Sequence, residues 1–374
     1  MRFLFLEPFF GGSHRDFAEG LVAHSCHEID LVTLPARFWK WRTRGAALHF
    51  IKNSPPLCDF NGLILSDLMS LSDFRCLAGT GCPPALVYFH ENQITYPVAP
   101  GESRDVQFGF TDITTALAAH RILFNSRTHC DAFFHALPAF IGQMPEYKPH
   151  WVTGVIRNKA AVLYPGCQFS GEPAPLRKHF KTGAPPLIIW NHRWEFDKNP
   201  DAFFDALEAI FRNGIDFRLA ILGENFQAVP KVFIKAKERW GDRILQYGHV
   251  GSKQAYHDWL KRGTVVVSTA NQENFGISTV EAIRFGCFPI LPHRLAYPEV
   301  IPDRFHSLCL YRSHEDLVTK LGDVLKRPDR YLSARKALSI SMADFAWENM
   351  ISAYDRELKK LADSATGSGH ELET

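Results

Sequence analysis

The sequence predicts an α/β protein built from two doubly wound, Rossmann-like domains, and three observations predict this fold class. The chain has 374 residues, which at roughly 150 residues per domain corresponds to about two domains. Short apolar runs bounded by turn residues alternate with helical stretches, as in parallel sheets with crossover helices. A stretch rich in glycine and proline, within residues 166–186, divides these runs into two series. We therefore expect two α/β units joined by a linker.

The predicted strands form two sets with the same pattern. The first set lies at residues 2–6, 62–65, 85–89, 121–124 and 161–163, and the second at residues 187–190, 217–222, 244–247, 264–268, 288–291 and 308–311. A helix is predicted over residues 197–214, because its apolar side chains share one face and Gly214 is a C-terminal stop; they are Phe203, Phe204, Leu207, Ile210 and Phe211.

These patterns predict the boundaries of the parts. We expect an N-terminal domain at residues 1–168, a linker at 169–186, a C-terminal domain at 187–342, a helix at 343–363 packing back toward the first domain, and a disordered tail at 364–374.

Composition narrows the class of protein without indicating a partner. A net charge of +2 and an isoelectric point near 8.1 argue neither for nor against nucleic acid, so such binding needs a local basic patch. The eight cysteines are scattered without a CxxC pair, which favours buried reduced thiols over a zinc site. The apolar run at the N-terminus is too short for a signal peptide, and no run approaches the ~18 residues of a membrane span. We therefore expect a cytoplasmic protein.

The strongest candidate for a ligand site follows the predicted strand at 264–268. Glu273 precedes a predicted helix, Glu281 lies inside it, and Gly276 lets the backbone approach a ligand. Backbone N–H groups at the start of this helix, from Ile277 to Thr279, suit an anionic phosphate. The two carboxylates then address different parts of one elongated ligand. The alternative is that the spacing arises by chance and that Glu281 faces solvent.

A second loop agrees with this site. Arg193 and Lys198 follow the predicted strand at 187–190, in the sequence NHRWEFDKNP. This loop resembles the Arg…Lys-Asn-Pro loop of the GT4-like retaining glycosyltransferases. The resemblance implies that Arg193 and Lys198 hold a diphosphate and stabilise the charge that develops on a leaving group, a task otherwise done by a divalent metal. Ion pairs with Glu195 or Asp197 are the alternative.

Two further loops follow strands of the first set. Gly11 and Gly12 come after the first strand, either to admit donor phosphates or simply to make a tight turn. The run HENQ, residues 90–93, leaves the strand at 85–89 with the density of hydrogen-bonding groups that suits a sugar, although a lone histidine after a strand is more often structural. Asn125 and Ser126 end the next strand and could line the same cleft, with a helix cap as the alternative for Ser126.

A basic and aromatic segment at residues 36–45, ARFWKWRTRG, is the local patch that nucleic-acid binding requires. Its aromatics can stack on bases while its cations contact phosphates. The alternative is a helix with a charged outer stripe and aromatics turned into the core.

Several of these segments together resemble the tRNA-queuosine mannosyltransferases, a branch of the GT4-like retaining glycosyltransferases. The segments are EPFFGGSH (7–14), WKWR (39–42), YFHENQITYP (88–97), FGFTDI (108–113), RILFNS (121–126) and the Glu-x7-Glu element from Glu273 to Glu281. The resemblance covers nearly both domains and fails only in the linker and the tail. It implies a GT-B fold, in which an acceptor-binding and a nucleotide-sugar-binding domain face a cleft.

The resemblance also implies a reaction and its residues. The expected reaction is a metal-independent, retaining transfer of mannose from GDP-mannose to the cyclopentenediol of queuosine in a tRNA anticodon, of the tRNA-Asp type, without a cofactor. The implied catalytic residues are His90, Glu273, Arg193 and Lys198. The implied donor-binding residues are Gly11, Gly12, Arg193, Lys198, Asn274, Phe275, Gly276, Ile277, Ser278 and Glu281. The implied acceptor and tRNA contacts are Ser13, His14, Arg37, Trp39, Lys40, Trp41, Arg42, Arg44, Glu91, Asn92 and Gln93.

Two other functions stay open on the residues alone. One is a related glycosyltransferase that acts on a small molecule, a lipid or a polysaccharide. The other is a non-catalytic protein that binds tRNA or a nucleotide, against which the joint presence of Glu273, Glu281, Arg193 and Lys198 argues.

Overall fold

The computed structural model describes residues 1–99, 101–169, 184–223 and 229–366, which form two compact units. Unit 1 comprises Met1–Gln168 together with Phe345–Thr374, and unit 2 comprises Phe169–Asp344. Most of the expected linker, and the expected tail beyond Thr366, lie outside the described residues.

Unit 1 contains a six-stranded parallel sheet in the order β2-β1-β3-β4-β5-β6. Its strands are β1 (Arg2–Phe10), β2 (Glu28–Pro35), β3 (Gly62–Ser66), β4 (Ala85–Phe89), β5 (Arg121–Phe124) and β6 (Ala160–Val162). The chain leaves β1 on one side to form β2 and then crosses to the other side to form β3. The topological switch point, where ligands bind in such sheets, therefore lies at the carboxyl ends of β1 and β3.

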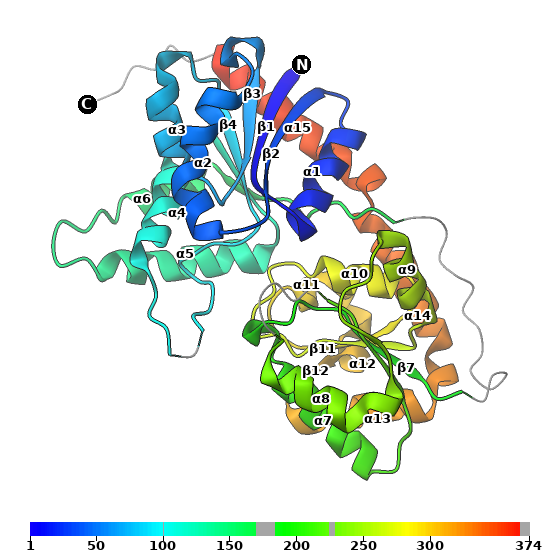
Figure 1. The fold of residues 1–374 in the computed structure, drawn as a ribbon. Helices are drawn as coiled ribbons and strands as arrows, with labels where there is room; N and C mark the ends of the chain where they lie inside the picture. Colours follow the sequence, from blue (N-terminus) through cyan, green and yellow to red (C-terminus); the bar gives the residue numbers. More distant parts are fainter. Residues whose placement is uncertain (100, 170–183, 224–228, 367–374) are drawn as a thin grey trace. The chain divides into compact units, whose positions relative to one another are not determined.

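The helices of unit 1 cover both faces of this sheet (Figure 1). Phe3 and Phe5 point to the face covered by α1 (Gly12–His24) and α15 (Trp347–Thr366), whereas Leu4 and Leu6 point to the opposite face. The alternation follows from the two-residue period of a strand. The opposite face is covered by α2 (Trp39–Asn53), α3 (Leu71–Ala78), α4 (Val106–Ala118), α5 (Arg127–Gly142) and α6 (Val152–Asn158).

The last helix, α15, is anchored in unit 1 by Trp347. Its indole is fully buried, and a Cβ at Gly20 of α1 would lie 1.9 Å from Trp347 Nε1, so the two helices approach this closely only with glycine at that position. Tyr354 donates a hydrogen bond to the carbonyl of Tyr164 at 2.8 Å. The helix ends at Thr366, so residues 364–366, which were expected to belong to a disordered tail, are helical.

Unit 2 contains a second six-stranded parallel sheet, in the order β12-β11-β10-β7-β8-β9. Its strands are β7 (Leu187–Trp190), β8 (Arg218–Ile221), β9 (Ile244–Tyr247), β10 (Val265–Val267), β11 (Phe288–Pro292) and β12 (Leu310–Tyr311). The first strand, β7, has β8 on one side and β10 on the other. The switch point of unit 2 is therefore at the carboxyl ends of β7 and β10.

Helices flank both faces of this second sheet (Figure 1). One side carries α7 (Pro200–Arg212), α8 (Lys231–Trp240) and α13 (His314–Lys326), and the other carries α9 (Lys253–Arg262), α10 (Ile277–Arg284) and α14 (Leu332–Ser341). Helix α7 is shorter than predicted because Phe196–Lys198 form a 3₁₀ turn and Pro200 starts the helix. Four of the five side chains predicted for its apolar face are buried, and Phe211 is half-buried.

The state of the cysteines and the character of the helices bear on two expectations drawn from composition. All eight cysteines are unpaired thiols, but only Cys167, Cys287 and Cys309 are buried; the prediction of buried thiols is wrong for the exposed Cys26, Cys58 and Cys76. Throughout the described residues, no helix combines the length and apolar character needed to cross a bilayer.

Candidate functional site

The two predicted ligand loops of unit 2 lie at its switch point, because one follows β7 and the other follows β10. They are joined by hydrogen bonds. Thr269 Oγ1 donates to the carbonyl of Asn199 at 2.8 Å, and the backbone N–H of Asn271 donates to the carbonyl of Asp197 at 2.7 Å. The residues predicted from two separate motifs are thus held as one structure.

Lys198 is the central cation of this structure. Its ammonium group is buried, donates to the carbonyl of Gln272 at 2.6 Å, and lies 3.1 Å from Asp197 Oδ2 and 3.4 Å from Glu273 Oε2. Burial opposes the charged form, but the Glu273 and Asp197 carboxylates raise the pKa of Lys198 above its ordinary value. Lys198 is therefore a permanent positive charge beside Glu273.

Arg193 differs from Lys198 in its exposure. Its side chain is 45% exposed and lies 3.3 Å from Glu195 Oε2. The ion pairs that were the alternative to a ligand site, Arg193 with Glu195 and Lys198 with Asp197, are therefore both present. The next residue, Trp194, is in contrast buried, and its ring stacks on that of Phe233 with the centroids 4.2 Å apart, which fixes the backbone of the loop.

The start of α10 presents backbone amides next to Glu273. Gly276 has a φ of 95°, a left-handed conformation that favours glycine, and a Cβ there would lie 3.4 Å from Glu273 Cγ. The N–H of Thr279 is taken by the carbonyl of Gly276 at 2.9 Å. Within the described part of the chain, the N–H groups of Ile277 and Ser278 have no protein acceptor, so two of the three predicted amides are open to an anion.

Asn274 and Phe275, the two residues between Glu273 and Gly276, interact with the protein itself. Asn274 Oδ1 accepts a hydrogen bond from Gln272 Nε2 at 2.9 Å, and Phe275 is buried. Their predicted contact with the donor remains a prediction.

Glu281 does not face solvent, so that alternative is wrong. Its carboxylate is buried and lies 2.6 Å from Lys253 Nζ on α9. Although burial opposes the charged form, His257 and Lys253 lower the pKa of Glu281 below its ordinary value. Lys253 was not among the predicted residues and gave no signal in the sequence, because it comes from a helix distant in sequence from both motifs.

Unit 1 places buried ionisable groups at its own switch point. Glu7 of β1 is completely buried, and Asp67, which follows β3, is nearly so. Glu7 Oε1 accepts hydrogen bonds from the N–H of Phe9 at 2.8 Å and from Ser66 Oγ at 3.0 Å. Neither carboxylate was among the predicted site residues, although Glu7 interrupts an otherwise apolar strand and such an interruption is a usable signal.

His14 and His90 meet beside Glu7. The two rings are 4.0 Å apart at their centroids and 32° from parallel, and His14 Nδ1 lies 3.3 Å from Glu7 Oε1. The backbone of His90 is held on both sides, since its N–H donates to Asp67 Oδ1 at 2.8 Å and its carbonyl accepts from Asn125 Nδ2 at 2.8 Å. His14 is buried, which suits contact with His90 better than the predicted contact with an acceptor.

The rest of the predicted sugar-facing loop is built around Asn92. Its buried Oδ1 accepts from the N–H groups of Ile94 and Thr95, so it folds the loop. Gln93 Nε2 donates to Glu91 Oε1 at 3.0 Å, and both side chains are half-buried. Ser126 Oγ accepts from the N–H of His129 at 3.0 Å, so the capping alternative is confirmed for Ser126.

The glycines after β1 have a steric explanation. A Cβ at Gly11 would lie 2.4 Å from the Cβ of Ala36, so a larger residue would clash with the chain that follows β2. Gly12 has a φ of 51°, and Ser13 is exposed at the start of α1. The turn therefore requires glycine whether or not a phosphate binds there.

The basic and aromatic segment forms the first turns of α2 and the residues before it. Trp41 is 78% and Phe38 69% exposed, whereas Trp39 is half-buried with its ring 5.0 Å from that of Phe108. The alternative, aromatics turned inward, thus holds only for Trp39. The cations Arg37, Lys40 and Arg44 are exposed and Arg42 is half-buried. Phe38 was not among the predicted contacts.

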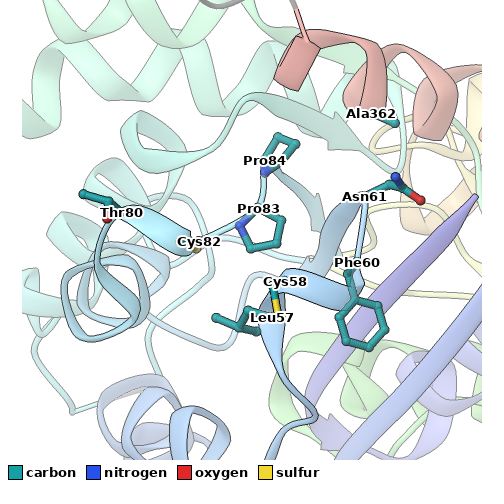
Figure 2. A pocket seen from close by; sticks show the side chains of 10 residues that line it. Leu57, Cys58, Phe60, Asn61, Thr80, Cys82, Pro83, Pro84 and Ala362 are labelled. Atoms are coloured by element: carbon teal, nitrogen blue, oxygen red, sulfur yellow. The ribbon is translucent and has the colours of Figure 1, made fainter.

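A hollow in unit 1 contains none of the predicted site residues (Figure 2). It has a volume of about 320 Å³ and is lined by residues that include Cys58, Phe60, Cys82 and Ala362. Asn61 and Pro84 in its wall precede β3 and β4. The hollow is therefore at the amino edge of the sheet, opposite the switch point.

Comparison with known proteins agrees with both sets of loops. The model of a family described as tRNA-queuosine alpha-mannosyltransferase N-terminal matches residues 2–167, and the model described as glycosyl transferases group 1 matches residues 174–339. A tRNA-queuosine alpha-mannosyltransferase of Drosophila melanogaster is 36% identical over 335 residues, covering 87% of this chain and 87% of that protein. The chain belongs to the tRNA-queuosine alpha-mannosyltransferase family.

More distant relatives resemble this family member over shorter stretches or in fold. A GDP-mannose-dependent alpha-(1-6)-phosphatidylinositol dimannoside mannosyltransferase of Mycobacterium tuberculosis is 25% identical over 177 residues, which are 47% of this chain and 44% of that protein. Sucrose-phosphate synthase from Thermosynechococcus elongatus has a TM-score of 0.72 at 14% identity, covering 97% of this chain and 100% of that one. The catalytic domain of starch synthase IV from Arabidopsis thaliana has a TM-score of 0.68 at 10% identity, covering 97% and 99%. The fold of this family member is therefore the predicted GT-B fold.

Proposed function

We propose that this chain is a hexosyltransferase that transfers mannose from GDP-mannose to the cyclopentenediol of queuosine in a tRNA anticodon. Its similarity to the Drosophila protein over most of both chains supports mannose as the sugar and queuosine as the acceptor. The name of the mycobacterial relative supports GDP-mannose as the donor. A tRNA acceptor also agrees with the cytoplasmic location expected from the sequence.

The observation that carries the proposal is the switch point of unit 2. Lys198, Arg193 and the N–H groups of Ile277 and Ser278 offer positive charge and donors to an anion. A nucleoside diphosphate is such an anion, and the cations would stabilise the charge that develops on it as it leaves. We propose that these residues replace a divalent metal, so that no metal or cofactor is required.

Glu273 and Glu281 would bind the other parts of the donor. We propose that Glu273, whose position is fixed by Lys198 at 3.4 Å, accepts hydrogen bonds from hydroxyls of the transferred mannose. Glu281, kept ionised by Lys253 and His257, would accept from the ribose hydroxyls. A carboxylate paired with a buried lysine is poorly suited to act as a nucleophile, so we assign Glu273 to binding and not to a covalent intermediate.

The proposed reaction retains the anomeric configuration. GDP-mannose carries an α-linked sugar, and an α-mannosyl product then requires attack from the face that the leaving group occupies. The bond from the anomeric carbon to the β-phosphate oxygen breaks, the bond from this carbon to the queuosine oxygen forms, and the hydroxyl proton passes to the departing phosphate. His90 of unit 1 would bind the transferred sugar near the reacting carbon.

The tRNA would bind through the exposed part of α2 and the residues before it. Arg37, Lys40 and Arg44 can contact phosphates, and Trp41 offers an exposed ring on which an unstacked base can stack.

The proposal is tested with purified protein, GDP-[¹⁴C]mannose and tRNA that contains queuosine. We expect label in the tRNA, and after digestion to nucleosides we expect it in a queuosine derivative from which α-mannosidase releases mannose. Transfer of label to lipid or oligosaccharide acceptors, with none to the tRNA, would show that the chain is a glycosyltransferase of another acceptor class. Failure to hydrolyse or transfer from any nucleotide sugar would favour a non-catalytic binding protein.

A further inference from the structure

The proposed function leaves the buried Glu7 without a role. Its carboxylate is completely shielded from solvent and is held by Phe9 N–H at 2.8 Å and Ser66 Oγ at 3.0 Å. Two neutral donors do not offset the cost of burying a full negative charge, which calls for a positive partner.

The positive partner is His14 of α1. His14 Nδ1 lies 3.3 Å from Oε1 and 3.4 Å from Oε2 of Glu7. Burial opposes a charge on His14, but Glu7, with smaller contributions from Asp67 and Glu91, raises the pKa of His14 above its ordinary value. The geometry and the charge balance therefore make Glu7 and His14 a buried ion pair.

The ion pair is in direct contact with His90. The His14 ring lies over the His90 ring at 4.0 Å, and the His90 ring is also bounded by Phe17 at 5.0 Å and Tyr88 at 4.9 Å. Burial, followed by the positive charge of His14, lowers the pKa of His90 well below its ordinary value. His90 is thus a neutral imidazole enclosed by rings on several sides.

We propose that Glu7 and His14 are positioning residues that keep the His90 imidazole neutral and fixed in one orientation, so that it exchanges hydrogen bonds with hydroxyls of the sugar undergoing transfer. The inference rests on the proposed function, which supplies the role of His90. A protonated His90 would add a positive charge next to an anomeric carbon that itself becomes positive, so a neutral ring favours the reaction. His14 then acts through His90 and does not contact the acceptor.

The other ionisable groups around His90 do not replace His14 in this role. Asp67 accepts the N–H of His90, and burial raises the pKa of Asp67 to about 7. Glu91 is the next residue, and Asp112, on α4, accepts the N–H of Gln93 at 2.5 Å. His129, on α5, has its pKa lowered by burial to about 3 and is neutral. Among these groups His14 is the cation.

Histidine NMR tests this inference without requiring transfer activity. The protein is labelled with [¹³Cε1]histidine, and the His14 and His90 signals are assigned by their loss in His14→Asn and His90→Asn. At pH 7 we expect the wild-type signals of an imidazolium at His14 and a neutral ring at His90. In Glu7→Gln we expect His14 to become neutral at pH 7, and in His14→Asn we expect the pKa of His90 to rise. A neutral His14 in the wild type, or an unchanged His90 titration in His14→Asn, would overturn the inference.

Kinetics then separate a positioning role from a purely structural one. The Asn side chain in His14→Asn keeps a donor toward Glu7 but carries no charge, so we expect kcat to fall roughly tenfold with little change in the KM for GDP-mannose. The acidic limb of the pH profile should also move to higher pH. An equal loss of kcat at every pH would contradict the inference, because a structural defect alone has that effect.

Two controls complete the experiment. If a single variant fails to fold, Glu7→Gln/His14→Asn removes both charges of the pair together, and in it the pKa of His90 should still rise. Because Glu7, His14 and His90 have ligand atoms within 4.8 Å of one another, the metal content of the purified protein is also measured; a stoichiometric metal ion that is lost in His14→Asn would overturn the ion pair. If the wild type shows the expected NMR signals but transfers no mannose, the proposed function fails and the ion pair stands.

Discussion

The switch points of the two units have the same topology and opposite chemistry. In unit 2 the loops after β7 and β10 present a half-exposed arginine, a buried lysine and two backbone N–H groups, an arrangement that suits an anion from outside the protein. In unit 1 the ends of β1 and β3 carry buried carboxylates whose charge is met by a histidine of the same unit. One parallel-sheet design thus presents a site that suits an anion in one unit and an internally balanced hydrogen-bonding site in the other.

The largest effect on transfer is expected from substitution of Glu273 in unit 2. We expect Glu273→Ala to lower transfer by about 10³-fold or more, because it removes contacts with the mannose and the partner that fixes Lys198. The matched control is Glu238→Ala, on the exposed face of α8, which should keep wild-type activity. Full activity in Glu273→Ala, with circular dichroism unchanged, would remove unit 2 from the reaction.

Substitutions of Lys198 and Arg193 are both expected to lower activity but to differ in their effect on the stability of the protein. Each change to Met should reduce kcat by about 10²-fold, since each removes a positive charge that is proposed to stabilise the leaving group. Only Lys198→Met should also lower the free energy of unfolding, by about 3–5 kcal/mol, because it leaves the buried Asp197 without its partner. For the half-exposed Arg193 the expected change is within about 1 kcal/mol. Urea unfolding measures both, and equal stability losses would contradict the assigned burial.

Asp67, a buried carboxyl group of unit 1, is expected to make the stability of the protein depend on pH. Burial raises the pKa of Asp67 to about 7 from an ordinary 3.8, so the folded state binds more protons than the unfolded state between these values. Its contribution to stability is present below about pH 4 and is lost as the pH rises through 7. Asp67→Asn should therefore stabilise the protein by on the order of a few kcal/mol at pH 8 and hardly at all at pH 4. Urea unfolding at several pH values measures this, with the exposed Asp242→Asn as control; a pH-independent difference would refute the raised pKa.

The smallest expected effect concerns the surface of α2. Trp41→Ala should weaken tRNA binding by about 1 kcal/mol, through loss of stacking, without changing the melting temperature. Trp39→Ala should lower the melting temperature, because its ring packs on Phe108 at 5.0 Å. Filter binding and thermal unfolding distinguish them. Similar results for the two variants would mean that exposure does not decide which tryptophan contacts RNA.

The sequence was sufficient for the fold class and for the loops of unit 2. Strands β7 and β9 coincide with the predicted runs, because short apolar runs between turn residues are distinctive in buried parallel sheets. Strand β2 was missed, since it is an edge strand whose apolar residues are interrupted by Glu28, Asp30 and Thr33 and most of whose residues are half-buried. Its absence from the prediction also hid the switch point of unit 1.

The sequence could not predict contacts made across a sheet or between helices. Glu7, Asp67 and Lys253 acquire their surroundings only when separate strands and helices pack, and no local spacing reports that packing. The burial of His14 and the exposure of Phe38 could not be predicted from the sequence either. The position of a residue within one helical turn, or a single left-handed residue such as Phe38 with a φ of 56°, decides which side chain faces solvent.

A paired transfer assay shows whether the chain mannosylates queuosine in tRNA. The same tRNA is prepared with queuosine and with guanosine at the modified position, and each is incubated with wild-type protein and GDP-[¹⁴C]mannose. We expect label in the queuosine tRNA alone, and none when Glu273→Ala replaces the wild type. Equal labelling of both tRNAs, or labelling of neither by a folded wild-type protein, would contradict the proposed function.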